Sequence, residues 1–290
     1  MSEAENDTIR LQGLALGYPG RTLFENVDLS FGRGELTALI GRNGTGKSTL
    51  LRTIMGLLRP LRGSILIGQK SVHELPQRMI AAQISFVSTD DVRMGHLKVY
   101  DVVGLGRAPY TNWIGRLTDA DRAAVEESLR LVGMEAFGDK GIDTLSDGER
   151  QRVMLARALA QDTPMILLDE PTAFLDLPNK YEIGLLLRSL AHNHGKTILF
   201  STHDLNITLD LCDRIVMIDR GKFLHGTPDE MIANGSIGHL FDGTSIRFDR
   251  EKGAVSLTPE KKPAFERLEI SGMYGLCCAP VYAMLNTDRI

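Results

Sequence analysis

Short apolar runs alternate with longer stretches of helical periodicity along most of the chain. The runs 36–40, 165–168 and 197–200 are four or five residues long, which is the length of buried strands. Helical patterns begin at about Ser48 and Asn179 after the first two runs, and a further one follows the third. Buried strands that alternate with helices predict an α/β fold around a largely parallel sheet.

Two regions depart from this alternation. Residues 9–31 alternate polar and apolar positions around Tyr18-Pro-Gly20, a pattern typical of half-exposed antiparallel strands joined by a turn. Strand patterns are absent from about 89–161, where helical patterns dominate, notably at 119–131 and 149–160. We therefore expect an N-terminal antiparallel β element and a helical subdomain inserted into the α/β core.

The last part of the chain changes character from about residue 243. Apolar residues at 246 and 248, and again at 255 and 257, flank the polar run Arg-Glu-Lys-Gly and predict a β-hairpin. We expect one domain over residues 8–240 and a C-terminal extension over 243–290. Regulation, a share in a dimer contact and simple packing all stay open as roles for the extension, and packing is favoured.

Composition excludes several classes of protein. The 290 residues are 43% apolar and 24% charged, as in an ordinary globular protein. The apolar runs are far shorter than the ~20 residues needed to cross a bilayer. A net charge of -4 with scattered basic residues argues against nucleic acid as the main partner. A membrane role would therefore need a partner chain.

The cysteines and the amino terminus indicate a reducing compartment. Cys212, Cys277 and Cys278 cannot all pair within one chain, and the adjacent two could bridge only with strain. The first seven residues are polar and acidic and lack the basic and apolar segments of a secretory signal. We expect reduced thiols and a cytosolic protein.

The loop after the first apolar run has the composition of a phosphate-binding loop. Glycines allow backbone N–H groups to converge on an anion, and the following helix adds its positive N-terminal potential. Lys47 can reach the β- and γ-phosphates of a nucleotide, and Ser48 can give an oxygen to Mg²⁺. A glycine-rich turn with a chance lysine is the competing interpretation. The candidate nucleotide-binding residues of the loop are Gly41, Asn43, Gly44, Thr45, Gly46, Lys47, Ser48 and Thr49.

Two carboxylates follow the second apolar run. Asp169 and Glu170 stand at the carboxyl end of a buried strand, where open α/β sheets bind their ligands. We expect Asp169 to hold Mg²⁺ through water and Glu170 to act as the general base or polariser of the attacking water. An acidic corner between a strand and a loop is the structural alternative.

A second glycine-bearing stretch, Leu-Ser-Asp-Gly-Glu at residues 145–149, precedes a helical pattern. Ser146 and Glu149 match a capping box, in which each satisfies a backbone amide of the first helical turn. Capping does not explain Gly148, because glycine in a helix costs roughly 0.5–1 kcal/mol relative to alanine. A bare backbone at a positive helix end suits the close approach of an anion. The helix end at Gly148 is thus a candidate anion site, and the family resemblance described next implies that Ser146, Gly148 and Glu149 bind nucleotide.

Together these motifs resemble the nucleotide-binding subunit of an ATP-binding cassette (ABC) transporter, over roughly residues 8–240. The resemblance implies a P-loop NTPase core of the RecA-like type, with ATP and Mg²⁺ as cofactors. It also implies that Tyr18 stacks on adenine, that Asp176 belongs to the nucleotide site, and that His203 is the γ-phosphate switch that joins Lys47 and Glu170 in catalysis. A packing tyrosine and an ordinary loop histidine are the alternatives for Tyr18 and His203.

In that family, the signature stretch of one subunit closes over the nucleotide held by the phosphate loop of another. Because this chain carries one copy of each device, the resemblance implies a head-to-tail homodimer that encloses two ATP molecules. Ser146 and Gly148 would then act in trans.

One position departs from the family pattern. The family places a glutamine between the core strand and the helical insertion, where it touches Mg²⁺ or the attacking water, and Thr89 occupies that position here. We expect water or a neighbouring group to fill the gap, so that hydrolysis persists while its coupling to the nucleotide state is altered. The alternative is that Gln83 or a shifted loop substitutes.

Loop sequences at 104–110, 112–116 and 117–122 resemble those of importers of iron(III)-siderophore, haem and cobalamin. The resemblance implies an ATPase peripheral to the cytoplasmic face of the membrane, partnered by transmembrane permease subunits and, indirectly, by a substrate-binding protein. Apolar residues of the insertion would form either an exposed groove for a permease helix or the subdomain's own core: Met94, Leu97, Val99, Tyr100, Trp113 and Ile114.

Other classes of protein share some of these motifs. A soluble cassette ATPase of DNA repair or iron–sulfur assembly would carry the whole set, although a repair protein needs a long coiled-coil insertion that this chain lacks. A phosphate-loop kinase or GTPase would share only the loop and the acidic strand. An ABC transporter of another substrate class is the remaining alternative.

Overall fold

The computed structural model describes residues 7–18, 20–88, 95–111, 115–250 and 253–257. Its central sheet has the strand order β10-β9-β3-β8-β7-β6. The strands from β9 to β6 are parallel, and β10 pairs antiparallel with β9. The predicted α/β fold is confirmed. The strands are β3 (Leu36–Gly41), β6 (Ile84–Val87), β7 (Met165–Leu168), β8 (Thr197–Ser201), β9 (Arg214–Asp219) and β10 (Lys222–Gly226).

An antiparallel sheet of order β2-β1-β4-β5 forms the predicted front element. Strands β1 (Asp7–Tyr18) and β2 (Arg21–Gly32) pair with one another as their polar and apolar alternation predicts. Strands β4 (Arg62–Ile67) and β5 (Lys70–Ser71) extend this sheet, and the sequence pattern had not indicated them.

Hydrophobic packing covers both faces of the central sheet, because side chains alternate across each strand. Leu39 of β3 and Leu199 of β8 point to the side that α1 (Lys47–Ile54) and the antiparallel sheet cover. Ile40 and Phe200 belong to the other core, which includes the long helix α6 (Leu177–His194). The remaining core helices are α2 (Gln77–Ala81), α7 (Leu205–Leu211) and α8 (Pro228–Ala233).

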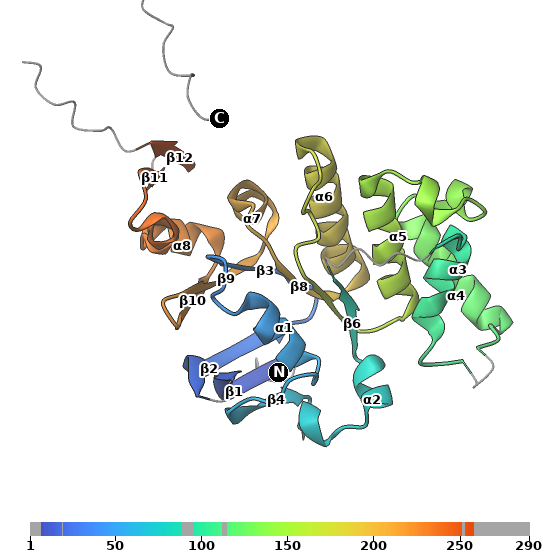
Figure 1. The fold of residues 1–290 in the computed structure, drawn as a ribbon, viewed down its shortest axis with the longest axis horizontal. Coiled ribbons are helices and arrows are strands. Elements are labelled where there is room, and N and C mark those ends of the chain that lie inside the picture. Colours follow the sequence, from blue (N-terminus) through green and yellow to red (C-terminus); the bar gives the residue numbers. More distant parts are fainter. Residues whose placement is uncertain (1–6, 19, 89–94, 112–114, 251–252, 258–290) are drawn as a thin grey trace, which may run out of the picture.

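Three helices form a group at one end of the molecule, as the pattern at 89–161 predicts. They are α3 (Val99–Gly104), α4 (Asp119–Leu131) and α5 (Asp147–Ala160), and they pack on one another. Figure 1 shows this group in green on the far side of α6 and β6 from α1. Single 3₁₀ turns occur at Val72–Glu74, Leu105–Arg107, Glu135–Phe137 and Ile142–Thr144.

A 3₁₀ segment, Ser236–Phe241, leads into the C-terminal extension, which contains the predicted hairpin, β11 (Ile246–Asp249) and β12 (Ala254–Leu257). The hairpin forms a two-stranded sheet of its own. In the part of the chain described, no helix combines the length and the apolar character that crossing a membrane requires.

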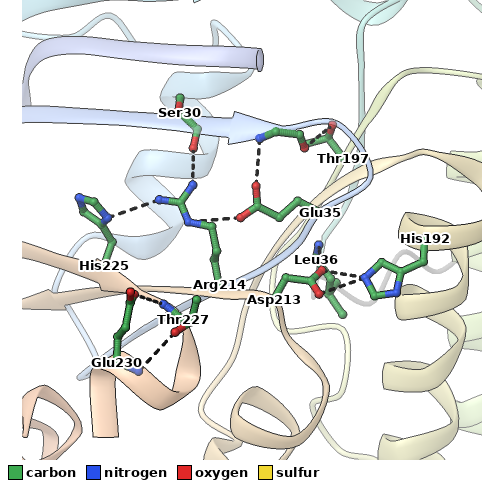
Figure 2. A network of polar contacts seen from close by, with 11 residues as sticks. Ser30, Glu35, Leu36, His192, Thr197, Asp213, Arg214, His225, Thr227 and Glu230 are labelled. Atoms are coloured by element: carbon green, nitrogen blue, oxygen red, sulfur yellow. Dashed lines mark hydrogen bonds and ion pairs between the residues drawn. The ribbon is translucent and has the colours of Figure 1, made fainter. Parts of the chain in front are cut away.

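A polar network fixes the amino ends of the central strands (Figure 2). Asp213 accepts a hydrogen bond from the backbone N–H of Leu36 at 2.8 Å and contacts His192 Nε2 at 2.9 Å. Beside it, Arg214 lies 3.2 Å from a carboxylate oxygen of Glu35, and burial raises the pKa of Glu35. These contacts connect β3, β9 and α6 at the amino ends of the strands. Open α/β sheets bind their ligands at the opposite edge, where the strands have their carboxyl ends.

Candidate active site

The phosphate loop connects β3 to α1 at the carboxyl edge of the central sheet. Its backbone adopts conformations that favour glycine, with φ of 76° at Gly44 and 104° at Gly46. A Cβ atom at Gly46 would lie 3.0 Å from the ring of Phe24, and one at Gly41 would lie 2.8 Å from the carbonyl oxygen of Ile218. The loop is therefore fixed by packing as well as by its left-handed turns.

A hollow of about 310 Å³ lies over this loop. It opens toward the first turn of α1, where backbone N–H groups lack partners within the helix. Arg21 and Leu23 border it from β2, and sequence reasoning had not selected them, although they directly follow the Tyr18 turn. The predicted residues that border it are Tyr18, Asn43, Gly44, Gly46, Lys47, Ser48, Thr49 and Glu170.

Tyr18 reaches the hollow from the end of β1, and its hydroxyl lies 3.3 Å from Thr49 Oγ1. Half of its side chain remains exposed. Thr45, a predicted nucleotide-binding residue, does not border the hollow. Its hydroxyl stabilises the loop by donating to the carbonyl oxygen of Arg42 at 2.8 Å. Tyr18 thus offers an aromatic surface at the edge of the hollow.

Lys47 is the buried cation of the site. Its Nζ donates to the carbonyl oxygen of Gly41 at 2.8 Å and lies 3.3 Å from His203 Nε2. Burial lowers the pKa of Lys47, while the nearby carboxylates of Glu170 and Asp169 act in the opposite direction. An anion in the hollow would stabilise this buried ammonium further, because burial outweighs the effect of the two carboxylates.

Ser201 holds both predicted carboxylate residues in place. It is fully buried at the end of β8, donates from Oγ to Asp169 Oδ1 at 2.5 Å, and accepts from the Glu170 backbone N–H at 2.9 Å. Sequence reasoning missed this role. The available signal was a serine at the end of an apolar strand that directly neighbours the acidic one.

Glu170 and His203 form the contact at the centre of the site. Glu170 Oε1 lies 2.7 Å from His203 Nε2, and the same nitrogen lies 3.3 Å from Lys47 Nζ. Glu170 adopts a positive φ of 47°, an uncommon conformation for a residue with a side chain. The structure thus brings together the three residues expected to act in catalysis.

The signature stretch caps α5 as predicted. Ser146 Oγ accepts from the Glu149 backbone N–H at 3.3 Å, and Glu149 Oε2 accepts from the Ser146 backbone N–H at 2.9 Å. The Ser146 backbone N–H and the Ser146 hydroxyl, which also donates to Glu149 Oε2 at 2.8 Å, lower the pKa of Glu149. The helix therefore begins at a fully formed capping box.

Gly148 has a packing reason that sequence reasoning missed. A Cβ atom there would lie 3.1 Å from Asn179 Oδ1 of α6. Asn179 in turn donates from Nδ2 to Asp176 Oδ1 at 2.7 Å, and Asp176 caps α6 by accepting from the Asn179 backbone N–H. Glycine is favoured here because a larger residue would have to displace the Asn179 side chain.

The signature and Asp176 lie outside the hollow of their own chain. No residue of 145–149 borders it, and neither does Asp176. Figure 1 shows α5 within the helical group, separated from α1 by α6 and β6. Within one chain the two predicted phosphate devices therefore do not meet.

Several predicted positions can be compared with the structure only in part. Thr89, the third candidate metal residue, lies outside the described residues, as do Met94, Trp113 and Ile114, and Cys277 and Cys278 of the extension. Gln83 precedes β6 and borders a different hollow with Asp7 and Arg33, at the amino end of the strand. It therefore cannot replace a residue at the carboxyl edge.

The apolar residues of the helical group divide between core and surface. Val99 is fully buried and Tyr100 packs against the core, whereas Leu97 is 38% exposed. Leu105 and Tyr110, near α3, are also exposed. The core interpretation is correct for Val99 and Tyr100, and an apolar surface remains at the other three.

Comparison with known proteins agrees with this geometry. The sequence profile of the ABC transporter family matches residues 24–173. A dimeric solved structure, the ATP-binding cassette MJ0796 in a post-hydrolysis state with ADP and Pi, superposes with a TM-score of 0.65 and 28% identity. The match covers 76% of this chain and 98% of that one.

Three relatives have import or transport names. The achromobactin transport ATP-binding protein CbrD of Dickeya dadantii is 38% identical over 79% of this chain and 86% of its own length. The iron(3+)-hydroxamate import ATP-binding protein FhuC of Bacillus subtilis is 34% identical over 87% and 95%. The cobalamin import ATP-binding protein BtuD of Halobacterium salinarum is 36% identical over 87% and 63%.

Proposed function

Because the chain belongs to the ABC transporter family of ATP-hydrolysing proteins, we propose that it is the ATPase subunit of an importer for iron(III) chelates or a related metal chelate such as cobalamin. The observation that carries this proposal is the convergence of Lys47, Glu170 and His203 beside the hollow over the phosphate loop. The imported compound follows from the relatives' names alone, since selectivity belongs to other chains.

In this proposal each residue of the site has a separate role in ATP hydrolysis. Lys47 binds the β- and γ-phosphates, Tyr18 supports the adenine, and the loop amides hold the remaining phosphate oxygens. Glu170 accepts a proton from the attacking water, or polarises it, while its contact with His203 orients the carboxylate. His203, which follows β8, would contact the γ-phosphate. Because its Nε2 also lies beside both Glu170 and Lys47, it would connect the residue that activates water with the residue that binds phosphate.

The donor set fits Mg²⁺. Ser48 borders the hollow, and Asp169, held by Ser201, directly precedes Glu170, which also borders it, so the site offers oxygen ligands of the kind that Mg²⁺ prefers. Among the described residues no group of three or more His, Cys, Asp or Glu side chains is arranged so that it could hold a metal ion by itself. Magnesium in such sites commonly takes one or two protein ligands and completes its shell with water and substrate phosphates. Bound there, the ion would offset the charge that develops on the phosphates.

The working unit in this proposal is a head-to-tail homodimer. The signature helix begins away from the hollow of its own chain, with Ser146 exposed at its end. A second copy turned by a twofold axis would bring that helix end to the γ-phosphate side of the first copy's ATP. The dimeric state named for the similar cassette supports this arrangement.

The membrane partners belong to the same proposal. Leu97, Leu105 and Tyr110 are exposed apolar residues in or beside the helical group, and in this proposal they contact a permease helix. The subunit would then sit on the cytoplasmic side of the membrane, and a substrate-binding protein would act on the far side of the permease. ATP binding would draw the two copies together, and hydrolysis would release them.

The test is to trap the dimer. Glu170→Gln keeps the shape of the side chain but removes the base, so it should bind MgATP, hydrolyse it at least ~100-fold more slowly and accumulate as a dimer. Sedimentation velocity with and without MgATP reads the assembly, and copurification of permease chains from membranes reads the transport role. A strictly monomeric Glu170→Gln protein with bound MgATP would overturn the shared site. A fully active dimer that never recovers a membrane chain would favour a soluble cassette ATPase.

A further inference from the structure

Arg42 belongs to the phosphate loop but does not border the hollow over it. Its backbone carbonyl oxygen is an acceptor for several groups of the loop. Thr45 Oγ1 donates to it at 2.8 Å, the Thr45 backbone N–H donates at 3.3 Å, and Lys47 Nζ lies 3.5 Å away. The position of Arg42 therefore affects how the loop presents Lys47. The phosphate-loop pattern accepts any residue at this position, so the motif does not explain an arginine.

The Arg42 side chain contacts a part of the chain that is remote in sequence. Its Nη1 donates to the backbone carbonyl oxygen of Asp242 at 3.2 Å, across 200 residues. Asp242 lies between the 3₁₀ segment Ser236–Phe241 and the C-terminal extension. We call residues 236–242 the connecting segment and the contact between Arg42 and Asp242 the clasp. Because the acceptor is a backbone carbonyl, the clasp depends on where the connecting segment lies.

Three contacts fix the connecting segment on the core. Ile237 is fully buried, and His239 Nδ1 lies 3.4 Å from Asp219 Oδ2 at the end of β9. The carboxylate of Asp242 lies 3.1 Å from Nη2 of Arg220, in the turn between β9 and β10. The segment therefore offers the clasp an acceptor at a defined place beside the phosphate loop.

The extension continues from the clasp to the catalytic residues. Gly243 follows the connecting segment with a φ of 77° and turns the chain toward β11. A hollow of about 590 Å³ is bordered on one side by Glu170 and His203, and on another by Phe241 and Val255. This hollow is separate from the one over the phosphate loop, although Glu170 borders both. The C-terminal part of the chain thus lies beside both the phosphate loop and the catalytic carboxylate.

We propose that Arg42 is a positioning residue of the ATPase site, and that the clasp couples the C-terminal extension to nucleotide binding. The inference rests on the proposed function, because it assumes that the phosphate loop binds ATP. A glycine-rich loop has much conformational freedom to lose when it binds phosphate, and an anchor at Arg42 removes part of that freedom beforehand. Arg42 acts through the backbone of the loop and does not touch the nucleotide.

Coupling of this kind is reciprocal. If the connecting segment favours nucleotide binding through the clasp, nucleotide binding must stabilise the connecting segment by the same factor. A partner that pulled the extension away from the core would therefore weaken ATP binding. Simple packing of the extension, the role favoured from the sequence, predicts no such link. The two roles can be separated by experiment.

The first experiment measures nucleotide binding and turnover in the full-length protein. Arg42 is exposed, so Arg42→Ala should fold normally. The dissociation constant of MgADP in calorimetry and the KM for ATP should both rise by roughly 3- to 10-fold, the equivalent of one hydrogen bond. The kcat should stay nearly unchanged, because no group that touches substrate is removed.

A second variant and a control test whether the effect passes through the clasp. Arg220→Ala releases Asp242 and should also weaken nucleotide binding, and combining it with Arg42→Ala should add little, because both changes open the same contact. Arg62→Ala is the matched control. The Arg62 side chain is 76% exposed, against 72% for Arg220, pairs with Glu25 and borders neither hollow. Its affinity for MgADP should equal that of wild type.

The second experiment measures the reciprocal effect by hydrogen exchange and mass spectrometry. The backbone N–H of Asp242 donates to the His239 carbonyl at 3.3 Å, and that of Thr244 donates to the Phe241 carbonyl at 3.0 Å. Saturating MgADP should slow exchange in the peptide that contains these two amides in wild type. In Arg42→Ala the slowing should disappear there, while the phosphate loop itself is still protected.

Four outcomes would overturn the clasp. They are wild-type affinity in Arg42→Ala, a loss of affinity that vanishes in about 1 M salt and so reflects charge alone, fully additive effects of Arg42→Ala and Arg220→Ala, and exchange at Asp242 that does not respond to MgADP. Each would leave the proposed function intact. Failure of Lys47→Ala to weaken nucleotide binding would instead remove the phosphate-loop site on which both proposals depend.

Discussion

Replacing Ser201 by alanine tests whether the end of β8 organises the catalytic carboxylates. The substitution removes one hydrogen bond to a carboxylate, at 2.5 Å, and one from the Glu170 amide, at 2.9 Å. The Glu170 amide keeps a bond of 3.2 Å to the Ser201 carbonyl, so the main loss falls on Asp169. A hydrogen bond to a charged group contributes about 1.5–3 kcal/mol, and we therefore expect Ser201→Ala to lower the free energy of unfolding by about 2 kcal/mol.

The same change should slow hydrolysis, because Asp169 loses the partner that orients it toward Mg²⁺. We expect kcat to fall by roughly 10-fold, which corresponds to about 1.4 kcal/mol of transition-state stabilisation. Urea unfolding followed by circular dichroism measures the first effect, and steady-state phosphate release measures the second.

Thr163→Ala provides the control. Thr163 is also a fully buried hydroxyl, but its partners, Ser85 Oγ at 3.0 Å and the Met165 carbonyl at 2.8 Å, are neutral and lie at the amino end of the sheet. It should lower the free energy of unfolding by only about 1 kcal/mol and leave kcat unchanged. Equal effects of the two substitutions on kcat, or a Ser201→Ala protein as stable as wild type, would refute the reasoning.

Three further predictions follow from other contacts. Lys47→Ala should weaken ATP binding by roughly 10- to 100-fold in calorimetry with the fold intact, because a charge-assisted contact to phosphate is lost, and unchanged affinity would contradict its placement. Asp121 has its pKa lowered to about 2 by hydrogen bonds from Thr118 and then by Arg107. Its contribution to stability is therefore present above the unfolded pKa of about 3.9 and is lost as pH falls through the folded-state pKa of about 2. Asp121→Asn should cost about 1–2 kcal/mol at pH 7 and only a small part of that at pH 2, where the folded-state carboxyl is half protonated, as urea titrations at both values would reveal. Gly148→Ala should displace Asn179 and lower the free energy of unfolding by about 1 kcal/mol or more, with much of that cost absent in an Asn179→Ala background; fully additive effects would argue against the contact.

The local pattern of apolar and polar residues predicted the elements whose own sequence follows one clear periodicity. The limits of β7 and α4 agree with the sequence prediction, because one is a continuous apolar run and the other an amphipathic helix with a capping box at Thr118. The hairpin at Ile246 and Leu257 was equally accessible, since its turn and its alternation lie within a dozen residues. The phosphate loop was found because its function depends on backbone conformation that only glycine readily adopts.

Features that depend on distant pairing were not accessible in this way. Strand β4 is stabilised by β1, about fifty residues earlier in the chain, and several of its side chains are only half-buried, so its own pattern is weak. The role of Ser201 follows from the parallel register of β7 and β8, which places it beside Asp169. The nucleotide-binding role of Gly148 stays a prediction, and its packing neighbour Asn179, thirty-one residues away in the chain, became visible only in three dimensions.

The contact from Gly148 through Asn179 to Asp176 has a mechanical consequence. It sets the start of the signature helix directly against the start of α6, whose preceding loop leads back to Glu170. In the proposed ATP-bound dimer, each subunit would transmit a change at its own nucleotide to its signature helix, which contacts the nucleotide of the other subunit. Such a coupling predicts that the two pockets open in step, so that a heterodimer with one Asn179→Ala subunit would lose this synchrony and release its two products at different rates.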